Sequence, residues 1–398
     1  MALVNRDSMP QNGAPPPRTP PRGRRWLVVG AALLCVLALT AGGLYLANRS
    51  APGPAPLPPP AAQPGRQPAS PAGITALGLP RLAFGFYSAG FERNRCYGSC
   101  KPDGDGAANE KRNRQRMAEL ERMHVNFVIN NVSVKEWYAS SPKAFLAFLD
   151  DLHDSGIRVS YGLTSHRDVW LQNPKASGDK AGFTTDQAEA HFKATDLDGD
   201  GVSDLDGRLD VFYLSHEVLE WANHAQRVQM YQLAKRWLPN TPVSVYYASA
   251  ISRPTKAAFK DRPHRRGGTW ADYAYGPGEA DIVHLAAHRP FVDDRFDVRR
   301  STDDLKGDIE VVRRATPDVP IFVSSSFAYD DRMKRDPTSM WTPAQIEQWY
   351  EAVRSVRGVR GVFLRSYHRF TFDLGNPRFG AQRAQWARLG GAVAATTP

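Results

Sequence analysis

Acidic residues recur at alternate positions in one short segment near the middle of the chain. They stand at the first, third, fifth and ninth places of a loop: Asp196, Asp198, Asp200 and Asp204. Gly201 stands at the sixth place, and Asp206 follows as a further carboxylate. Calcium takes several oxygen ligands spaced in this way around a glycine turn. The spacing predicts a structural Ca²⁺ site formed by these five aspartates, and a solvated acidic turn is the alternative.

The segment 209–218 follows and, apart from Asp210 and Ser215, is apolar until it reaches His216 and Glu217. A run of this kind is typical of a strand buried in a parallel sheet. Barrels of alternating strands and helices present their chemistry at the C-terminal ends of such strands. We therefore predict that Glu217 is a catalytic acid/base, with His216 beside it.

Other apolar segments also end in hydrogen-bonding or aromatic side chains, which an apolar core does not require. The predicted substrate-binding set is Tyr87, Asn130, Asn131, Tyr161, His166, Tyr247, His284, His288, Arg365, Tyr367 and His368. Trp137 and Trp170 lie in the segments after two of the strands. Hydroxyl-rich sugars need hydrogen-bonding partners and flat aromatic surfaces, so this mixture favours a glycan as the ligand.

Eight segments are expected to form the strands that position these side chains. Segments with a helical pattern separate the strands. The expected strands are 81–90, 125–134, 157–165, 209–218, 242–249, 280–288, 320–329 and 359–370. Pro142 and the capping box that starts at Thr342 mark two helix starts, and Gly156 and Gly358 mark the ends of these helices.

The alternation predicts a (β/α)8 TIM barrel, since each parallel strand needs a covering helix. An open doubly wound sheet is the alternative, but no GxGxxG turn follows an early strand. Long segments after the first, third and fifth strands, including 166–207 with the acidic loop, are expected to be loops at the catalytic end of the barrel.

With these residues in place, the chain resembles the secreted TIM-barrel glycoside hydrolases. In their retaining clan the general acid/base is a Glu at the end of strand four, which Glu217 matches. The family's Asn before that Glu is His216 here, and strand seven ends in Ser324-Ser325-Ser326 instead of a nucleophilic Glu. The acidic loop resembles those of dockerin modules and thrombospondin-type repeats, with Gly207 at the twelfth place.

Glycoside hydrolysis requires a second carboxyl group near the first. Asp330 and Asp331, just past strand seven, are the preferred candidates. Asp293, Asp294 and Asp373 follow strands six and eight and remain open as alternatives.

Two other functions fit parts of the sequence. A non-catalytic glycan-binding barrel would account for the missing carboxylate on strand seven. A metal-dependent hydrolase would use histidines near strand ends: His166, His216, His284, His288 and His368. Barrel amidohydrolases carry an H-x-H on strand one, which this chain lacks. No organic cofactor is expected.

An uncharged apolar run at 26–47 has the length of a membrane-spanning helix. Arginines precede it, so the tail 1–25 is expected in the cytoplasm and the rest of the chain outside the cell. The segment 48–78 is rich in Pro and Ala and predicts a disordered linker to a barrel domain at 79–398. A cleaved signal peptide and a secreted protein are the alternative.

Cys96 and Cys100 are close together in the part expected outside the cell, which favours a small disulfide loop over a pair of ligands for a soft metal. The formal charge of +10 comes partly from the N-terminal tail and partly from basic loops. In an extracellular protein this charge favours acidic surfaces or glycans as partners and argues against nucleic acid.

Overall fold

The computed structural model describes most of the segment expected to form the barrel. The described residues are 79–87, 106–133, 142–162, 167–173, 182–215, 222–247, 251, 274–287, 291–292, 295–326, 341–365 and 379–396. The expected membrane anchor at 26–47 and the linker at 48–78 lie outside them. Within the described ranges, no helix combines the length and the hydropathy that crossing a bilayer requires.

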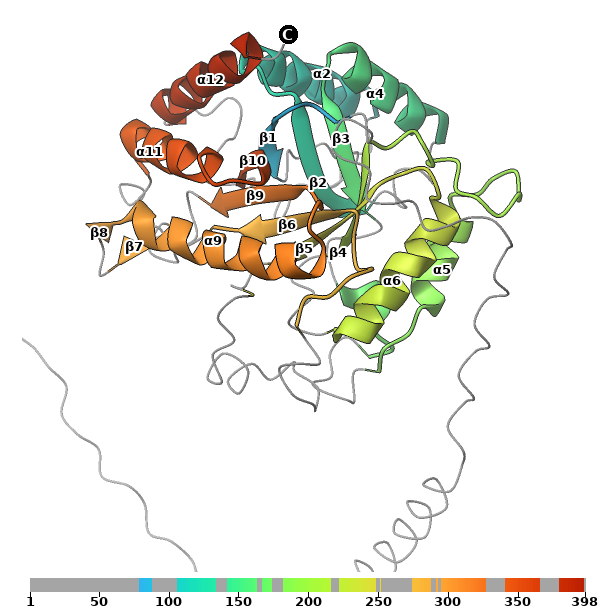
Figure 1. The fold of residues 1–398 in the computed structure, drawn as a ribbon. Helices are drawn as coiled ribbons and strands as arrows, with labels where there is room; N and C mark the ends of the chain where they lie inside the picture. Colours follow the sequence, from blue (N-terminus) through green and yellow to red (C-terminus); the bar gives the residue numbers. More distant parts are fainter. Residues whose placement is uncertain are drawn as a thin grey trace, which may run out of the picture. The chain divides into compact units, whose positions relative to one another are not determined.

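Eight parallel strands pair in chain order and close on themselves, which confirms the predicted (β/α)8 barrel (Figure 1). The strands are β1 Ala83–Tyr87, β2 Phe127–Ser133, β3 Arg158–Gly162, β4 Val211–Ser215, β5 Val243–Tyr247, β6 Ile282–Ala286, β9 Ile321–Ser326 and β10 Val359–Arg365. The closing pair is β1 with β10, where Ala83 lies opposite Gly361 and Tyr87 opposite Arg365. Each strand corresponds to one of the eight predicted segments.

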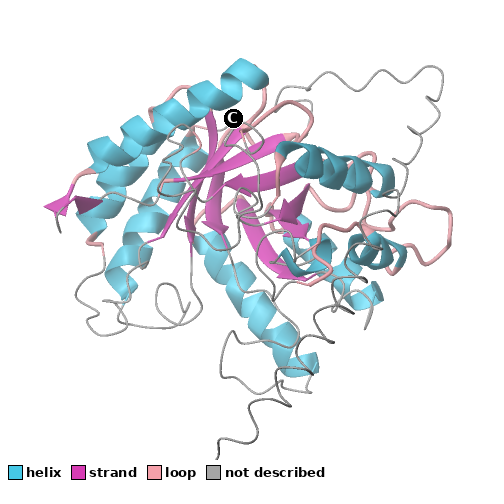
Figure 2. Cartoon of the chain, turned by 90° about the horizontal axis from the view of Figure 1, so that it is seen from below, coloured by secondary structure: helices cyan, strands magenta, loops and turns pink. Residues whose placement is uncertain are grey.

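Helices lie outside the strands, as Figure 2 shows. They are α2 Gly106–Arg122, α4 Pro142–Asp154, α5 Asp186–Lys193, α6 His224–Trp237, α9 Val298–Ala315, α11 Pro343–Arg354 and α12 Gly380–Ala395. A 3-10 turn, η2 Arg167–Trp170, follows β3, and the short strands β7 Phe291–Val292 and β8 Arg295–Phe296 pair antiparallel. No helix lies among the described residues between β5 and β6.

The helix boundaries follow from local chemistry. The Thr342 side chain accepts a hydrogen bond from the Gln345 backbone N–H, and the Gln345 side-chain oxygen accepts one from the Thr342 backbone N–H, so α11 begins with the predicted capping box. Gly156 has a φ of +71°, a left-handed conformation that favours glycine, and it follows the end of α4 as expected.

Two apolar layers hold the barrel together. The larger lies between the strands and the helices, where Phe84 of β1 stacks on Trp386 of α12 at 4.2 Å between ring centroids. The smaller fills the barrel interior, where the rings of Phe127, Phe322 and Phe363 lie 5.2–5.7 Å apart between centroids. Side chains of one strand alternate between these layers, because successive residues of a strand face opposite sides.

The segment 166–207 differs from its prediction as a single loop at the catalytic end. It contains α5, which is the barrel helix between β3 and β4. Phe192 of α5 stacks on Trp237 of α6 and contacts Phe212 of β4. The acidic loop therefore follows α5 and precedes β4, which places it at the N-terminal end of the barrel, opposite the end where Glu217 was predicted to act.

Candidate functional site

The strongest catalytic candidate, Glu217, lies just beyond the C-terminal end of β4. β4 ends at Ser215, and Glu217 is two residues further on. Several predicted site residues lie outside the described residues: His166, His216, Glu217, His288, Asp330, Asp331, Tyr367 and His368. Cys96 and Cys100 also lie outside them, and Asn131 and Arg365 are described by their backbone alone. Their predicted roles stay predictions.

Inside the barrel, three tyrosines and one histidine form a cluster that we call the inner polar cluster: Tyr87, Tyr213, Tyr246 and His284. The hydroxyl oxygens of Tyr87 and Tyr213 are 2.9 Å apart and share a hydrogen bond. The rings of Tyr87 and Tyr246 stack at 5.3 Å between centroids. The His284 ring lies edge-on to both, at 5.3 Å and 4.7 Å. All four residues are fully buried.

The inner polar cluster comes from strands on both sides of the barrel, namely β1, β4, β5 and β6. An unpaired polar group in an apolar interior is costly, and the hydroxyls of Tyr87 and Tyr213 avoid this cost by pairing with each other. Ser215 and Ser324 are also buried, and alternation with Phe322 places Ser324 on the same interior side. The interior is therefore polar beneath the C-terminal ends of these strands.

Of the predicted substrate-binding residues, Tyr87 and His284 belong to the inner polar cluster, whereas Tyr161 and Tyr247 do not. The Tyr161 ring contacts Phe145 of α4 at 5.4 Å between centroids, in the layer between strands and helices. Tyr247 lies in the same outer layer, since its neighbour Tyr246 faces inward. Asn130 is buried, and the register of β2 against β3 shifts beyond Ile129, so regular alternation does not assign its side chain to either layer. The structure therefore places Tyr161 and Tyr247 in the layer facing the helices and away from the barrel interior. The predicted contact of all three residues with a substrate stays a prediction.

Tyr213 and Tyr246 were not among the predicted site residues. Tyr213 sits in the middle of the apolar segment before Glu217, where nothing in the sequence separates it from core residues. Tyr246 and Tyr247 are adjacent, and only their alternation in the strand decides which of them faces inward.

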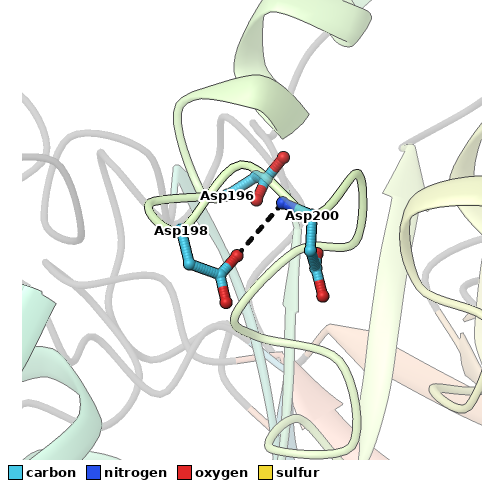
Figure 3. A group of neighbouring side chains, drawn as sticks. All are labelled: Asp196, Asp198 and Asp200. Atoms are coloured by element: carbon cyan, nitrogen blue, oxygen red, sulfur yellow. Dashed lines mark hydrogen bonds between the residues drawn. The ribbon is translucent and has the colours of Figure 1, made fainter.

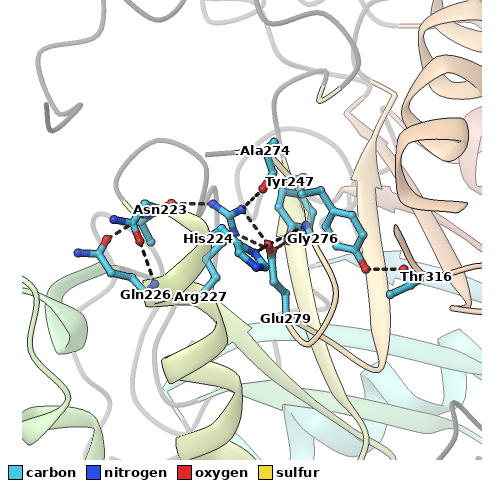
Figure 4. A network of polar contacts seen from close by, with 11 residues as sticks. Asn223, His224, Gln226, Arg227, Tyr247, Ala274, Gly276, Glu279 and Thr316 are labelled. Atoms are coloured by element: carbon cyan, nitrogen blue, oxygen red, sulfur yellow. Dashed lines mark hydrogen bonds and ion pairs between the residues drawn. The ribbon is translucent and has the colours of Figure 1, made fainter. Parts of the chain in front are cut away.

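A second polar group lies outside the strands and centres on a carboxylate that the sequence did not single out (Figure 4). Glu279 accepts hydrogen bonds from Arg227 Nε at 2.6 Å, from Arg227 Nη2 at 2.8 Å and from the Gly276 backbone N–H at 3.0 Å. The Tyr247 hydroxyl donates to the same carboxylate. Arg227 and Glu279 have no exposed surface. We call Glu279, Arg227, Tyr247 and His224 the Glu279 network.

Protonation in the Glu279 network follows from these contacts. Burial alone would raise the pKa of Glu279, but the Arg227 charge and the donated hydrogen bonds hold it below its usual value. An ionised carboxylate only accepts hydrogen bonds, so His224 Nδ1, 2.6 Å from Glu279 Oε1, carries the proton. Burial and the Glu279 charge raise the pKa of the Tyr247 hydroxyl, which keeps it a donor.

Arg227 also binds the chain where the segments that follow β4 and β5 end. Its Nη1 donates to the Ala222 carbonyl at 2.7 Å, and its Nη2 donates to the Ala274 carbonyl at 2.8 Å. Ala222 is six residues beyond the start of the segment after β4, which contains Glu217. Ala274 closes the long segment after β5. The Glu279 network thus fixes the point where each segment returns to the body of the barrel.

The acidic loop brings three carboxylates together, as Figure 3 shows. Oxygens of Asp196, Asp198 and Asp200 all lie within 4.8 Å of one another. Asp196 accepts hydrogen bonds from the backbone N–H groups of Gly199 at 2.9 Å and Gly201 at 3.1 Å. Gly201 has a φ of +87°, so the turn at the sixth place uses the conformation that glycine allows.

The other predicted ligands of the acidic loop have different positions. Asp204 accepts a hydrogen bond from the Leu197 backbone N–H at 3.2 Å, which keeps it at the loop. Asp206 binds the turn between α6 and β5, accepting from the backbone N–H groups of Asn240 and Thr241 at 2.9 Å and 2.8 Å. The donor set therefore fits a hard cation at Asp196, Asp198 and Asp200, with Asp206 engaged elsewhere.

Calcium should raise the melting temperature of the protein relative to the same protein in chelator. A ligand that binds only the folded state stabilises it by about 2.7 kcal/mol at a concentration a hundredfold above its dissociation constant. Asp198→Ala should remove this difference, whereas Asp303→Ala, a change at an exposed carboxylate in α9, should keep it. Identical melting curves for the wild type with and without chelator would contradict the site.

No protein-family model matches this sequence, and no curated protein does. Among solved structures, the β-D-glucuronidase of Dictyoglomus thermophilum is similar, with a TM-score of 0.49, 12% identity, and coverage of 80% of this chain and 51% of that chain. A GH2 β-galacturonidase from Eisenbergiella tayi gives a TM-score of 0.49, 11% identity, and coverage of 79% and 51%. The chain spans about half the length of these proteins. The barrel assignment itself rests on the strand pairing.

Proposed function

We propose that this protein is a glycoside hydrolase whose acid/base is Glu217. The observation that carries the proposal is the position of β4, the fourth strand of a closed barrel, which ends two residues before Glu217. Enzymes with this fold place their reacting groups just beyond the C-terminal ends of the strands. A carboxyl group delivered there by the chain can protonate a leaving glycosidic oxygen.

The second carboxyl group comes from the segment after β9 in this proposal. β9 ends at Ser326, and Asp330 and Asp331 follow four and five residues later. β4 and β9 are the fourth and seventh strands in barrel order, so both segments start at the same end of the barrel. One of these aspartates then acts as nucleophile or as the base that activates water.

The inner polar cluster supports a glycan as the substrate class. Tyr87, Tyr246 and His284 are buried beneath the strand ends and make the interior below the proposed site polar and aromatic. Sugars are recognised by hydrogen-bonding groups together with aromatic rings, so such a floor suits a sugar ligand. We place the barrel outside the cell, anchored by the apolar run at 26–47, with the calcium site as a structural element at the opposite end.

A glycan-binding protein without catalysis is the second candidate. The sequence of β9 favours it, because this strand ends in Ser324-Ser325-Ser326 and contributes no carboxylate. The two candidates differ in whether a bound glycan is cleaved.

Full-length protein incubated with a panel of bacterial and plant polysaccharides should release reducing sugars from at least one of them. Products are measured by reducing-end labelling and chromatography, and binding to the same panel is measured in parallel by affinity electrophoresis. Binding without release of products over long incubation would replace the hydrolase by the glycan-binding protein.

A further inference from the structure

A cavity lies at the N-terminal end of the barrel, away from the predicted catalytic end. It has a volume of about 1000 Å³ and lies between α9, the turn before β9 and the turn before β10. Four basic residues line it, namely Lys306, Arg313, Arg357 and Arg360, together with Glu310 and Asp318. The lining carries an excess of two positive charges, and all of it belongs to described residues.

Arg313 is held in place by the protein backbone. It comes from the last turn of α9, and its guanidinium donates to the Pro317 carbonyl and, at 3.5 Å, to the Gly358 carbonyl. Gly358 has a φ of +99°, and a Cβ atom there would lie 2.9 Å from a guanidinium nitrogen of Arg313. The left-handed φ favours glycine at this turn, and the two carbonyl hydrogen bonds hold the Arg313 guanidinium at the cavity wall.

Arg357 and Arg360 add further charge close to Arg313. Both are exposed, and within the described part of the chain neither forms an ion pair. The register of β10 against β9 shifts between Val359 and Gly361, which leaves Arg360 as the extra residue of a bulge. A bulge turns a side chain away from its regular direction. The pKa of Arg313 lies below its usual value. Burial is the main cause, the charge of Asp318 acts in the opposite direction, and the charges of Arg360 and Arg357 lower the pKa further.

A structural explanation accounts for only part of this cluster. Basic residues favour the C-terminal ends of helices, where they interact with the helix dipole and the last carbonyl groups. This explains Arg313 in α9. Arg357 and Arg360 lie beyond Arg354, the last residue of α11, and cap no helix. Their accumulation beside a fixed guanidinium costs repulsion that a bound anion would relieve.

We propose that this cavity binds a small ligand through a phosphate group held by Arg313, Arg357 and Arg360. Guanidinium groups present paired N–H donors that match the oxygens of a phosphate, and they stay charged at all physiological pH values. The cavity volume is within the range of sites for small molecules. The site is separate from the proposed hydrolase chemistry, which belongs to the other end of the barrel.

Isothermal titration of the full-length protein with inorganic pyrophosphate tests the site. The wild type should bind it, and the double variant Arg357→Ala/Arg360→Ala should bind at least about tenfold more weakly, because two of the three guanidinium groups that hold the phosphate are lost. The matched control is Arg208→Ala/Arg236→Ala, which removes two exposed arginines that pair with Asp150 and Glu189 elsewhere. Absence of binding by the wild type, or an equal loss in both double variants, overturns the proposal.

Competition identifies the chemistry of the ligand. Inorganic phosphate should displace pyrophosphate, whereas equal displacement by sulfate at the same ionic strength would overturn the assignment to phosphate. Glycerophosphoglycerol, a soluble phosphodiester, distinguishes the two sources of a phosphate group. If glycerophosphoglycerol binds more tightly than glycerol 3-phosphate, the site is supported and its ligand is a lipid headgroup. If it binds more weakly, the site is supported and its ligand is a phosphate monoester.

Discussion

Replacing Glu217 by Gln should lower the hydrolysis of a responsive glycan by about 10²- to 10⁴-fold, the usual contribution of a positioned acid/base. Gln keeps the shape and the hydrogen bonding of the side chain but cannot transfer a proton. The melting temperature should stay unchanged. The measurement is the initial rate of reducing-sugar release, with circular dichroism to confirm the fold.

The leaving group separates proton transfer from a structural role of Glu217. An aryl glycoside with a strongly acidic phenol leaves without protonation, so Glu217→Gln should slow its first step far less than it slows polysaccharide cleavage. Glu220→Gln is the matched control, because it removes a carboxylate three residues away in the same segment. Equal losses on both substrates, or an equal loss in the control, would mean that Glu217 is not the acid.

Asn variants of Asp330 and Asp331 identify the second carboxyl group. The variant of the reacting residue should lose activity on both polysaccharide and aryl glycoside, because nucleophile or base is needed whatever the leaving group. If neither variant loses activity, Asp293, Asp294 and Asp373 become the candidates.

The strands could be predicted from sequence because each is a short apolar run bounded by turn residues. β4 and β6 show this well, since their residues are almost all buried and few polar positions interrupt them. The sequence could not show which residues of a strand face the barrel interior and which face the helices. Both sides of a barrel strand are buried, so the polar alternation that usually reveals the inner side is absent. Tyr246 and Tyr247 are therefore equivalent in sequence and opposite in structure.

The sequence predicts the acidic loop at the wrong end of the barrel because the pattern of α5 is too weak to indicate a helix. This helix has only eight residues, and its buried side chains are Ala188 and Phe192. Such a short polar segment shows little helical periodicity, and its position depends on packing against Trp237 and Phe212. Once α5 is present, the loop must connect the end of a helix to the start of β4.

The Glu279 network depends on contacts that sequence does not reveal. Arg227 and Glu279 are 52 positions apart and lie in segments that read as an ordinary helix and an ordinary turn. A single acidic residue before a strand is usually a surface residue. Glu279 is buried because the segment 274–281 packs against α6 and β5. This packing depends on the closed barrel and is not visible in the sequence.

Glu279→Ala should destabilise the protein by about 3–5 kcal/mol, the usual result of removing one partner of a buried ion pair. Arg227 then remains as an unpaired charge with no exposed surface, and the Tyr247 hydroxyl loses its acceptor. Urea unfolding followed by circular dichroism measures the difference. The control is Glu189→Ala, since Glu189 pairs with the exposed Arg236, and it should change stability by less than about 1 kcal/mol.

The stabilisation by Glu279 should also depend on pH in a defined direction. The folded state holds the pKa of Glu279 below its usual value, so between the two pKa values the unfolded state binds more protons. Stability then rises with pH in that window and is complete above the pKa of the unfolded chain, about 4.3. It is lost as the pH falls through the lower pKa of the folded state.

Comparing the wild type with Glu279→Gln isolates this dependence. The amide keeps the size of the side chain but does not titrate, so the stability difference between the two proteins should be largest near neutral pH and should shrink in acid. Tyr247→Phe, which removes one hydrogen bond to the charged carboxylate, should cost about 1.5–3 kcal/mol. A difference between wild type and Glu279→Gln that stays constant down to strongly acidic pH would show that the carboxylate is not ionised in the folded protein, and the charge pairing with Arg227 would have to be abandoned.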